Sequence, residues 1–238
     1  GICSIGLANK TFEDIEFSGY FSDQLLNGLV YSSQEDFSFD ISGSVDFSLP
    51  VYNYNINVLL NRFRLNKFGI GSDELSNLNF NLNLDLNGNT SDELVGVLQF
   101  NDGRYADRDN YLEFKDLIIN SRLTNDDFRL FELISDDLVS GVVKSNVQWK
   151  NIDDYFKQVK NRILGISEPL SLNNQNNTLT FDLDLKSKIA ALLNPNFKLS
   201  ENSSLKGNFN LRDSLTQLSI NFTTLGLCAI DRVFARVK

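Results

Sequence analysis

The stretch of sequence that decides the fold runs from residue 78 to residue 88 and reads Leu78-Asn79-Phe80-Asn81-Leu82-Asn83-Leu84-Asp85-Leu86-Asn87-Gly88. Apolar and polar side chains alternate along it, and in an extended strand this places all the apolar side chains on one face. The same alternation recurs at residues 37–41, 45–49, 52–58, 179–185 and 205–211. The sequence therefore predicts an all-β chain whose strands each have one buried face and one solvated face.

Glycine-containing pairs that favour tight turns punctuate these strands. They are Asn27-Gly28, Ser42-Gly43, Asn87-Gly88, Asp102-Gly103 and Lys206-Gly207. Pairs of this kind, at the spacing typical of hairpins, join neighbouring antiparallel strands. We therefore expect a long antiparallel meander rather than parallel strands joined by crossovers.

Two segments depart from the alternation and have helical character. Between residues 151 and 164 the apolar side chains fall at helical spacing, at Ile152, Tyr155, Phe156, Val159 and Ile163. Asp153 and Asp154 suit the first turn of a helix, where negative charge is favoured. We expect an amphipathic helix here and a shorter second helix at Ser187–Leu193, which Asn194 and Pro195 would end.

The predicted elements suggest one continuous unit. We expect a β-meander over residues 1–150, the amphipathic helix at 151–165 and a continuing β segment over 166–238. Because the chain of 238 residues opens at Gly1 without a methionine, we expect it to be a fragment of a longer protein. We expect no signal peptide, and no apolar run approaches the roughly 20 residues that a membrane-spanning helix needs.

The composition argues against several kinds of functional site. The chain has no histidine, the commonest general base and metal ligand. Its two cysteines, Cys3 and Cys228, lie near opposite ends without the spacing of a zinc or redox motif, and whether they pair stays open. The net charge of −9 offers no basic surface for nucleic acid. We therefore expect no catalytic residues, no metal, no cofactor and no nucleic-acid partner.

The apolar strand faces need more cover than the predicted helices can give. Roughly a dozen strands have such a face, whereas soluble monomers rarely expose apolar patches beyond a few hundred Å². Three arrangements would hide this surface: a two-sheet sandwich, a closed barrel, or a sheet curled into a trough that holds an apolar ligand. The alternation alone does not choose among them.

The order of segments along the chain resembles that of a known family. The matching stretches are Phe12–Phe21, Leu26–Val30, Phe37–Phe47, Val51–Val58, Leu78–Gly88, Leu94–Leu98, Gly103–Tyr105 and Leu112–Ile119, followed by the helix and the Leu179–Leu185 strand. Over roughly residues 12–222 this order is similar to that of the TamB and AsmA-like family in its Bacteroidetes form. It is the order of the segments that carries the resemblance.

The resemblance implies a long antiparallel meander sheet, curled like a taco around an apolar groove. Members of that family are anchored in the inner membrane, bridge the periplasm and are implicated in phospholipid transport toward the outer membrane. For this chain we therefore expect a periplasmic location, with an inner-membrane anchor in a segment outside this fragment. The implied ligands are phospholipid acyl chains. The implied protein partner is an outer-membrane protein of the TamA or BamA type, engaged through other parts of the full-length chain.

The expected lining of the groove is the apolar side of the alternating strands. It comprises Phe37, Phe39, Ile41, Val45, Phe47, Tyr54, Ile56, Val58, Leu78, Phe80, Leu82, Leu84, Leu86, Leu179, Phe181, Leu183, Leu185, Phe209 and Leu211. The same side chains would form an ordinary dry core if the sheet were sealed. Two other interpretations stay open: an outer-membrane β-barrel, whose strands also alternate, and an extracellular β-sandwich binding module.

Overall fold

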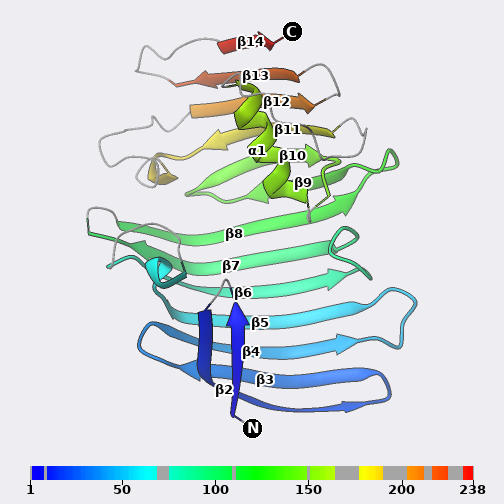
Figure 1. The fold of residues 1–238 in the computed structure, drawn as a ribbon, viewed down its shortest axis with the longest axis vertical. Helices are drawn as coiled ribbons and strands as arrows, with labels where there is room; N and C mark the ends of the chain where they lie inside the picture. The colour runs from blue at the N-terminus through cyan, green and yellow to red at the C-terminus, as the bar shows by residue number, and fades with distance from the viewer. Residues whose placement is uncertain are drawn as a thin grey trace.

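The computed structural model describes residues 2–7, 10–68, 75–108, 111–148, 151–163, 177–189, 203–211, 216–224 and 233–237. These residues form one fourteen-stranded β-sheet, with the α-helix α1 (Ile152–Ile163) and the 3-10 helix η1 (Leu65–Phe68) beside it (Figure 1). The strands are β1 (Ile2–Leu7), β2 (Lys10–Ser22), β3 (Leu25–Ser33), β4 (Phe37–Asp46), β5 (Asn53–Phe63), β6 (Asn77–Asn87), β7 (Val95–Ala106), β8 (Tyr111–Leu123), β9 (Arg129–Ile134), β10 (Val139–Ser145), β11 (Asn177–Leu185), β12 (Ser203–Leu211), β13 (Thr216–Thr223) and β14 (Val233–Val237).

Each strand pairs with the next one along the chain. The order across the sheet is β1 to β14, and the pairing is antiparallel throughout. The expected all-β meander is therefore confirmed. Among the described strands β1 and β14 each pair on one side only, so the sheet is not closed, and they form one sheet rather than the two layers of a sandwich.

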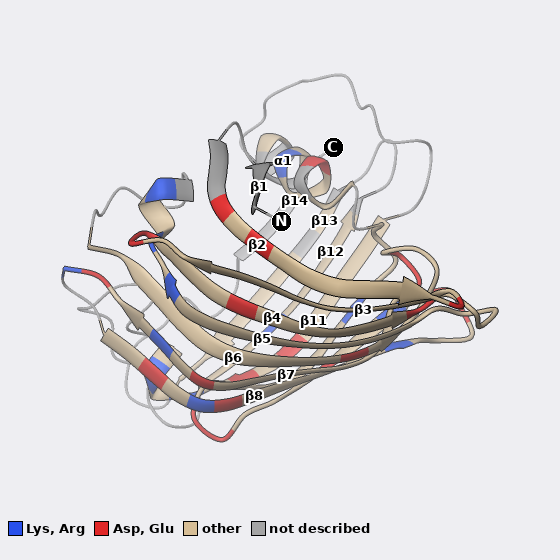
Figure 2. Cartoon of the chain, turned by 90° about the horizontal axis from the view of Figure 1, so that it is seen from below, with Lys and Arg blue, Asp and Glu red and all other residues tan. Residues whose placement is uncertain are grey.

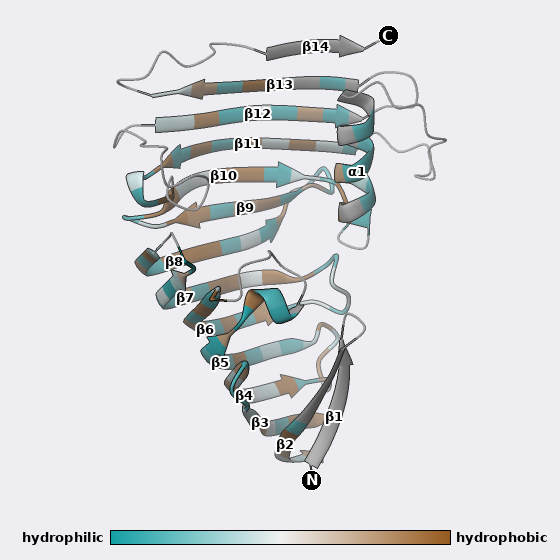
Figure 3. Cartoon of the chain, turned by 60° about the vertical axis from the view of Figure 1, so that its left-hand side comes forward, coloured by the Kyte–Doolittle hydropathy of each residue, from teal (hydrophilic) through white to brown (hydrophobic). Residues whose placement is uncertain are grey.

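The sheet is curled into a trough. Figure 2 shows strands that curve around a concave side, on which α1 lies, and Figure 3 shows the strands following one another along the length of the trough. Twist between neighbouring strands is general in β-sheets. Two glycines make room here for aromatic rings of a neighbouring strand. A Cβ atom at Gly103 would collide with the ring of Phe114, and one at Gly207 with the ring of Phe181.

Four of the five turn predictions are wrong. Asn27-Gly28 lies within β3, Ser42-Gly43 within β4, Asp102-Gly103 within β7 and Lys206-Gly207 within β12. The physical reason is that a glycine in a strand can serve the close approach of a neighbouring strand or ring, which local sequence does not distinguish from a turn. Asn87-Gly88 does mark the end of β6. A tight turn that the prediction missed joins β2 to β3 at Asp23-Gln24, where φ is 52° and 63°.

The amphipathic helix is confirmed as α1. Residues 164 and 165, at the end of its expected range, lie outside the described residues. Of the second expected helix, residues 187–189 are helical and 190–193 also lie outside the described part, as does Cys228. The sheet continues past α1 without interruption, because β10, which precedes the helix, pairs directly with β11, which follows it.

Buried apolar side chains concentrate at the end of the sheet where β4, β6, β8 and β10 begin, which we call the packed end. One cluster consists of Leu112, Phe114, Leu138, Val139 and Leu185, and another of Ile15, Phe39 and Leu60. The opposite end, where the same strands finish and α1 lies, is called the open end. The core of this fold is therefore concentrated at one end instead of extending evenly along the strands.

Candidate apolar groove on the inner face of the sheet

The strand register places the predicted groove residues on a common face. Ile41 pairs with Val58, and Val58 with Leu82, across β4, β5 and β6. Leu179 pairs with Phe209 across β11 and β12. Residues paired directly across adjacent strands point to the same side of a sheet. The buried Tyr155 of α1 packs against Leu179 and Phe209, so this side is the concave one, which we call the inner face.

A single row of inner-face residues runs along the trough and joins these two groups of strands. It consists of Ile56, Leu84, Leu98, Ile119, Leu133, Gly141, Leu183, Leu205 and Phe222, each paired with the next. Every residue of the row has an apolar side chain except Gly141, which has none. Because strands lie about 4.8 Å apart, the row is about 40 Å long. The inner face thus offers a continuous apolar path across nine strands, from β5 to β13.

Most of the predicted lining is half-buried rather than sealed. Phe39, Leu86 and Leu185 are buried, and the other predicted lining residues are half-buried, apart from Leu211, whose side chain lies outside the described part. Phe47 lies just beyond the end of β4. On β2, Phe21 pairs with Leu26 of β3 and is 65 % exposed. The inner face is therefore accessible from outside, most of all toward β2.

The prediction missed the lining that β7 to β10 contribute. In β7 the alternation changes phase at Asp102, which has a φ of 52°. The register between β6 and β7 shifts beside it, so that both Phe100 and Tyr105, five residues apart, pack toward the inner core. An extra residue of this kind is a β-bulge. The phase change is visible in the sequence, but the Asp102-Gly103 pair also fits a turn, which is what the sequence predicts there.

An apolar pocket of about 520 Å³ opens on the inner face toward the open end. Its walls come from β6 to β11 and from the start of α1, and include Leu94, Leu98, Ile119, Phe131, Val143 and Ile152. Pockets that bind small molecules usually measure about 300–1,000 Å³ and are mainly apolar. This pocket therefore has the size and the chemistry to hold part of an apolar ligand.

Of the described residues that line this pocket one is charged, Arg129 at the start of β9. It is buried, and its guanidinium donates hydrogen bonds to the backbone carbonyls of Asp92 and Leu94 and, at 3.4 Å, to Ser121 Oγ. Burial lowers the pKa of Arg129, and the charge of Asp92 acts in the opposite direction. Arginine nonetheless stays protonated at neutral pH. The pocket thus combines apolar walls with one positive charge.

Helix α1 covers part of the inner face at the open end (Figure 3). Tyr155 is completely buried against Leu179 and Phe209, and its hydroxyl donates a hydrogen bond to the Phe209 carbonyl at 3.1 Å. Burial raises the pKa of this phenol. The next residue, Phe156, is 48 % exposed. The helix therefore closes one corner of the groove and leaves the neighbouring pocket open.

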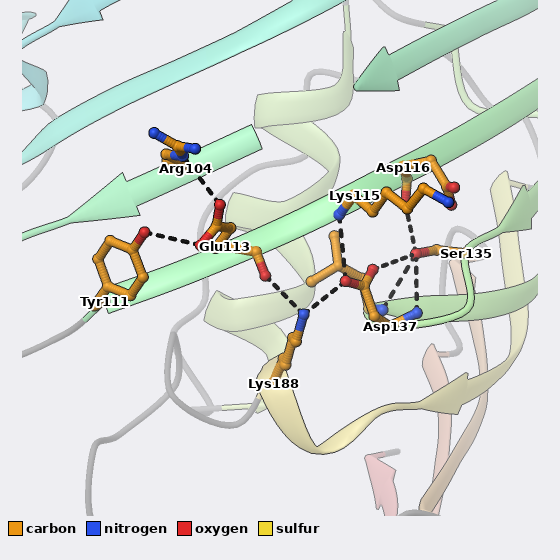
Figure 4. Close-up of polar contacts among 9 residues, drawn as sticks. Arg104, Tyr111, Glu113, Lys115, Asp116, Ser135, Asp137 and Lys188 are labelled. Carbon is orange, nitrogen blue, oxygen red and sulfur yellow. Dashed lines mark hydrogen bonds and ion pairs between the residues drawn. The ribbon is translucent and has the colours of Figure 1, made fainter. Parts of the chain in front are cut away.

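A polar network ties the packed end together (Figure 4). Asp137 accepts hydrogen bonds from Lys188 Nζ at 2.7 Å and from the Lys115 backbone N–H at 3.2 Å. Ser135 Oγ donates to the Asp116 carbonyl at 2.6 Å. Burial acts to raise the pKa of Asp137, but the hydrogen bonds from Lys188 and Lys115 and the charge of Lys188 hold it below its ordinary value. This network holds the segment after β11 onto β8 and the β9–β10 turn.

The outer face of the sheet is polar and carries exposed ion pairs. Lys206 Nζ lies 2.7 Å from Asp182 on the neighbouring strand, and Arg104 Nε lies 3.1 Å from Glu113. Isolated apolar residues such as Val142 are exposed there. Val142 and Val143 are consecutive residues of β10 that point to opposite faces.

Comparisons with known proteins leave the family open: no family model, no curated protein and no solved structure matches the chain. None of the described helices has the length and apolar character needed to cross a membrane. Among the described side chains, no three His, Cys, Asp or Glu residues gather where they could hold a metal ion.

Proposed function

We propose that this chain is a structural, non-enzymatic module of a Gram-negative cell envelope that holds phospholipid acyl chains in its inner-face groove. The observation that carries the proposal is the apolar row from Ile56 to Phe222, which is half-exposed and widens into a pocket of about 520 Å³. A dry core would hide such a surface under a second layer. Among the described residues outside the sheet, α1 covers a corner of it.

The energetics of lipid transfer support this role. Exposing an acyl chain to water costs about 0.8 kcal/mol per methylene, so moving both chains of a phospholipid through water costs on the order of 20 kcal/mol. An apolar surface that continues for about 40 Å removes much of that barrier. Such a function needs neither a base nor a nucleophile, which agrees with a chain that has no histidine.

The resemblance to the TamB and AsmA-like family gives the proposal its cellular setting. The module would lie in the periplasm, within a longer protein anchored in the inner membrane, and would act in phospholipid transport between the two membranes. The full-length protein would engage a TamA- or BamA-type partner through other regions. The curled, open sheet supports this setting because a trough, unlike a closed pocket, can be extended by further strands at both edges.

Co-purified lipid and a matched pair of substitutions test the proposal. We expect native mass spectrometry of the chain, purified from a Gram-negative host, to detect bound phospholipid. Val143→Asp places a carboxylate on the apolar wall of the pocket and should lower lipid occupancy at least about tenfold, since acyl chains would then bury a charged group. Val142→Asp places the same charge on the outer face and should leave occupancy unchanged.

Circular dichroism of both variants controls for unfolding. Should Val143→Asp unfold the chain, Val143→Phe fills the pocket without adding charge and should lower occupancy while the fold is kept. A lipid-free wild-type preparation, or equal occupancy in the inner-face and outer-face variants, would refute the groove.

A further inference from the structure

Burying the charge of Arg129 in the pocket costs free energy. The binding of acyl chains alone does not explain why a charged side chain lies there. Arg129 is only 8 % exposed and lies on the inner face, paired with Ser145 of β10 and two residues before Phe131. A buried charge is destabilising unless it is paired and hydrogen-bonded. A pocket that bound only hydrocarbon would be better lined by an apolar side chain at this position.

The surroundings of Arg129 leave part of its binding capacity available. Its three hydrogen bonds go to uncharged oxygen atoms, the carbonyls of Asp92 and Leu94 and the hydroxyl of Ser121. Its guanidinium carbon also lies 5.9 Å from the centre of the Phe131 ring. A guanidinium has about five N–H donors in a planar fork. Within the described part of the chain these bonds leave two donors for a ligand in the same pocket, where the negative charge of Asp92 also acts on the guanidinium.

Building on the proposed groove function, we propose that Arg129 binds the phosphate group of a phospholipid whose acyl chains lie on the inner face. A guanidinium fork matches two phosphate oxygens, and hydrogen bonds between opposite charges are roughly twice as strong as neutral ones. The phosphate would lie at the open end beside the β6–β7 connection, which supplies the Asp92 and Leu94 carbonyls. The acyl chains would extend from there over Leu98 and Ile119.

A purely structural role for Arg129 makes a different prediction. The same hydrogen bonds join the β6–β7 connection to β8 and β9, so the side chain could serve only to hold that loop. In that case, its removal would weaken binding of charged and uncharged lipids alike. A phosphate-binding role predicts instead a selective loss, confined to ligands that carry the phosphate.

Binding of short-chain phosphatidate and of diacylglycerol with the same acyl chains separates the two roles. We expect wild-type chain to bind phosphatidate about tenfold more tightly, since a hydrogen bond between opposite charges is stronger than one between neutral groups. Arg129→Met should abolish this preference and leave diacylglycerol binding unchanged. Arg122→Met, a matched substitution of an exposed arginine at the end of β8, should behave like wild type.

Each other outcome overturns a stated part of the proposal. Equal wild-type binding of the two lipids, or a preference that survives in Arg129→Met, removes the phosphate-binding role and leaves the groove intact. Failure of wild type to bind either lipid refutes the groove itself. Binding of inorganic phosphate to wild type as tightly as phosphatidate would assign the site to a free anion instead of a phospholipid. The wild-type preference is measurable even if Arg129→Met does not fold.

Discussion

The two ends of the inner face are built from the same strands and differ in what lies over them. At the packed end of β10, Val139 is 8 % exposed within a cluster that includes Phe114, whereas at the open end of the same strand Val143 lines an accessible pocket. Ile189 packs against the cluster at the packed end, and Lys188 ties the same segment to Asp137. Identical alternation therefore produces a core at one end and a groove at the other.

The largest effect should come from breaking the packed end. Phe114→Ala removes a buried ring that lies over Gly103, and it should lower the free energy of unfolding by about 3–5 kcal/mol. Urea denaturation followed by circular dichroism measures this. A loss below about 1 kcal/mol would mean that the packed end is no better packed than the open end.

The same substitution made at both ends of one strand sharpens the comparison. Val139→Ala should cost about 2 kcal/mol, because it leaves a cavity in a closed cluster. Val143→Ala should cost less than about 1 kcal/mol, because its side chain already borders an open pocket and the substitution seals no new cavity. Only Val143→Ala should also change lipid occupancy. Equal costs in urea denaturation would show that both ends are sealed core.

Much of the fold could be predicted because alternation is a local property. The stretch from Leu78 to Leu86 lies within β6, and the spacing of Ile152 and Tyr155 marks α1. In both cases, the side chains that share a face are set by the geometry of a single element. The antiparallel order of the strands was also predicted correctly, although it was inferred from five turn pairs of which four lie within strands.

The division of the inner face into a packed end and an open end could not be predicted from the sequence, because it depends on contacts between segments that are distant along the chain. Leu112 is buried through contact with residues near 138 and 185, which no local pattern connects. Arg129 was likewise missed, although it stands in phase with Phe131 and Leu133, and a charge in phase with apolar residues was a usable signal. Its burial among the Asp92 and Leu94 carbonyls could come only from the structure.

The smallest effect should come from removing the charge of Asp137 at the packed end while its apolar cluster stays intact. The folded-state pKa of Asp137 lies below its ordinary value. The stabilisation from its charge is therefore present above the unfolded-state pKa of about 3.9, and it is lost as the pH falls through the lowered folded-state value. Asp137→Asn should thus cost about 1 kcal/mol at pH 7, and the difference from wild type should vanish in acid.

Denaturation series at neutral and acid pH measure this difference, with the exposed neighbour Asp136→Asn as the control. The control should stay within about 0.5 kcal/mol of wild type. Because Asp137 fastens Lys188 at the packed end, lipid occupancy at the open end should not change. A pH-independent cost would show that Asp137 acts through packing and not through its charge, and a simultaneous loss of lipid would show that the two ends are coupled.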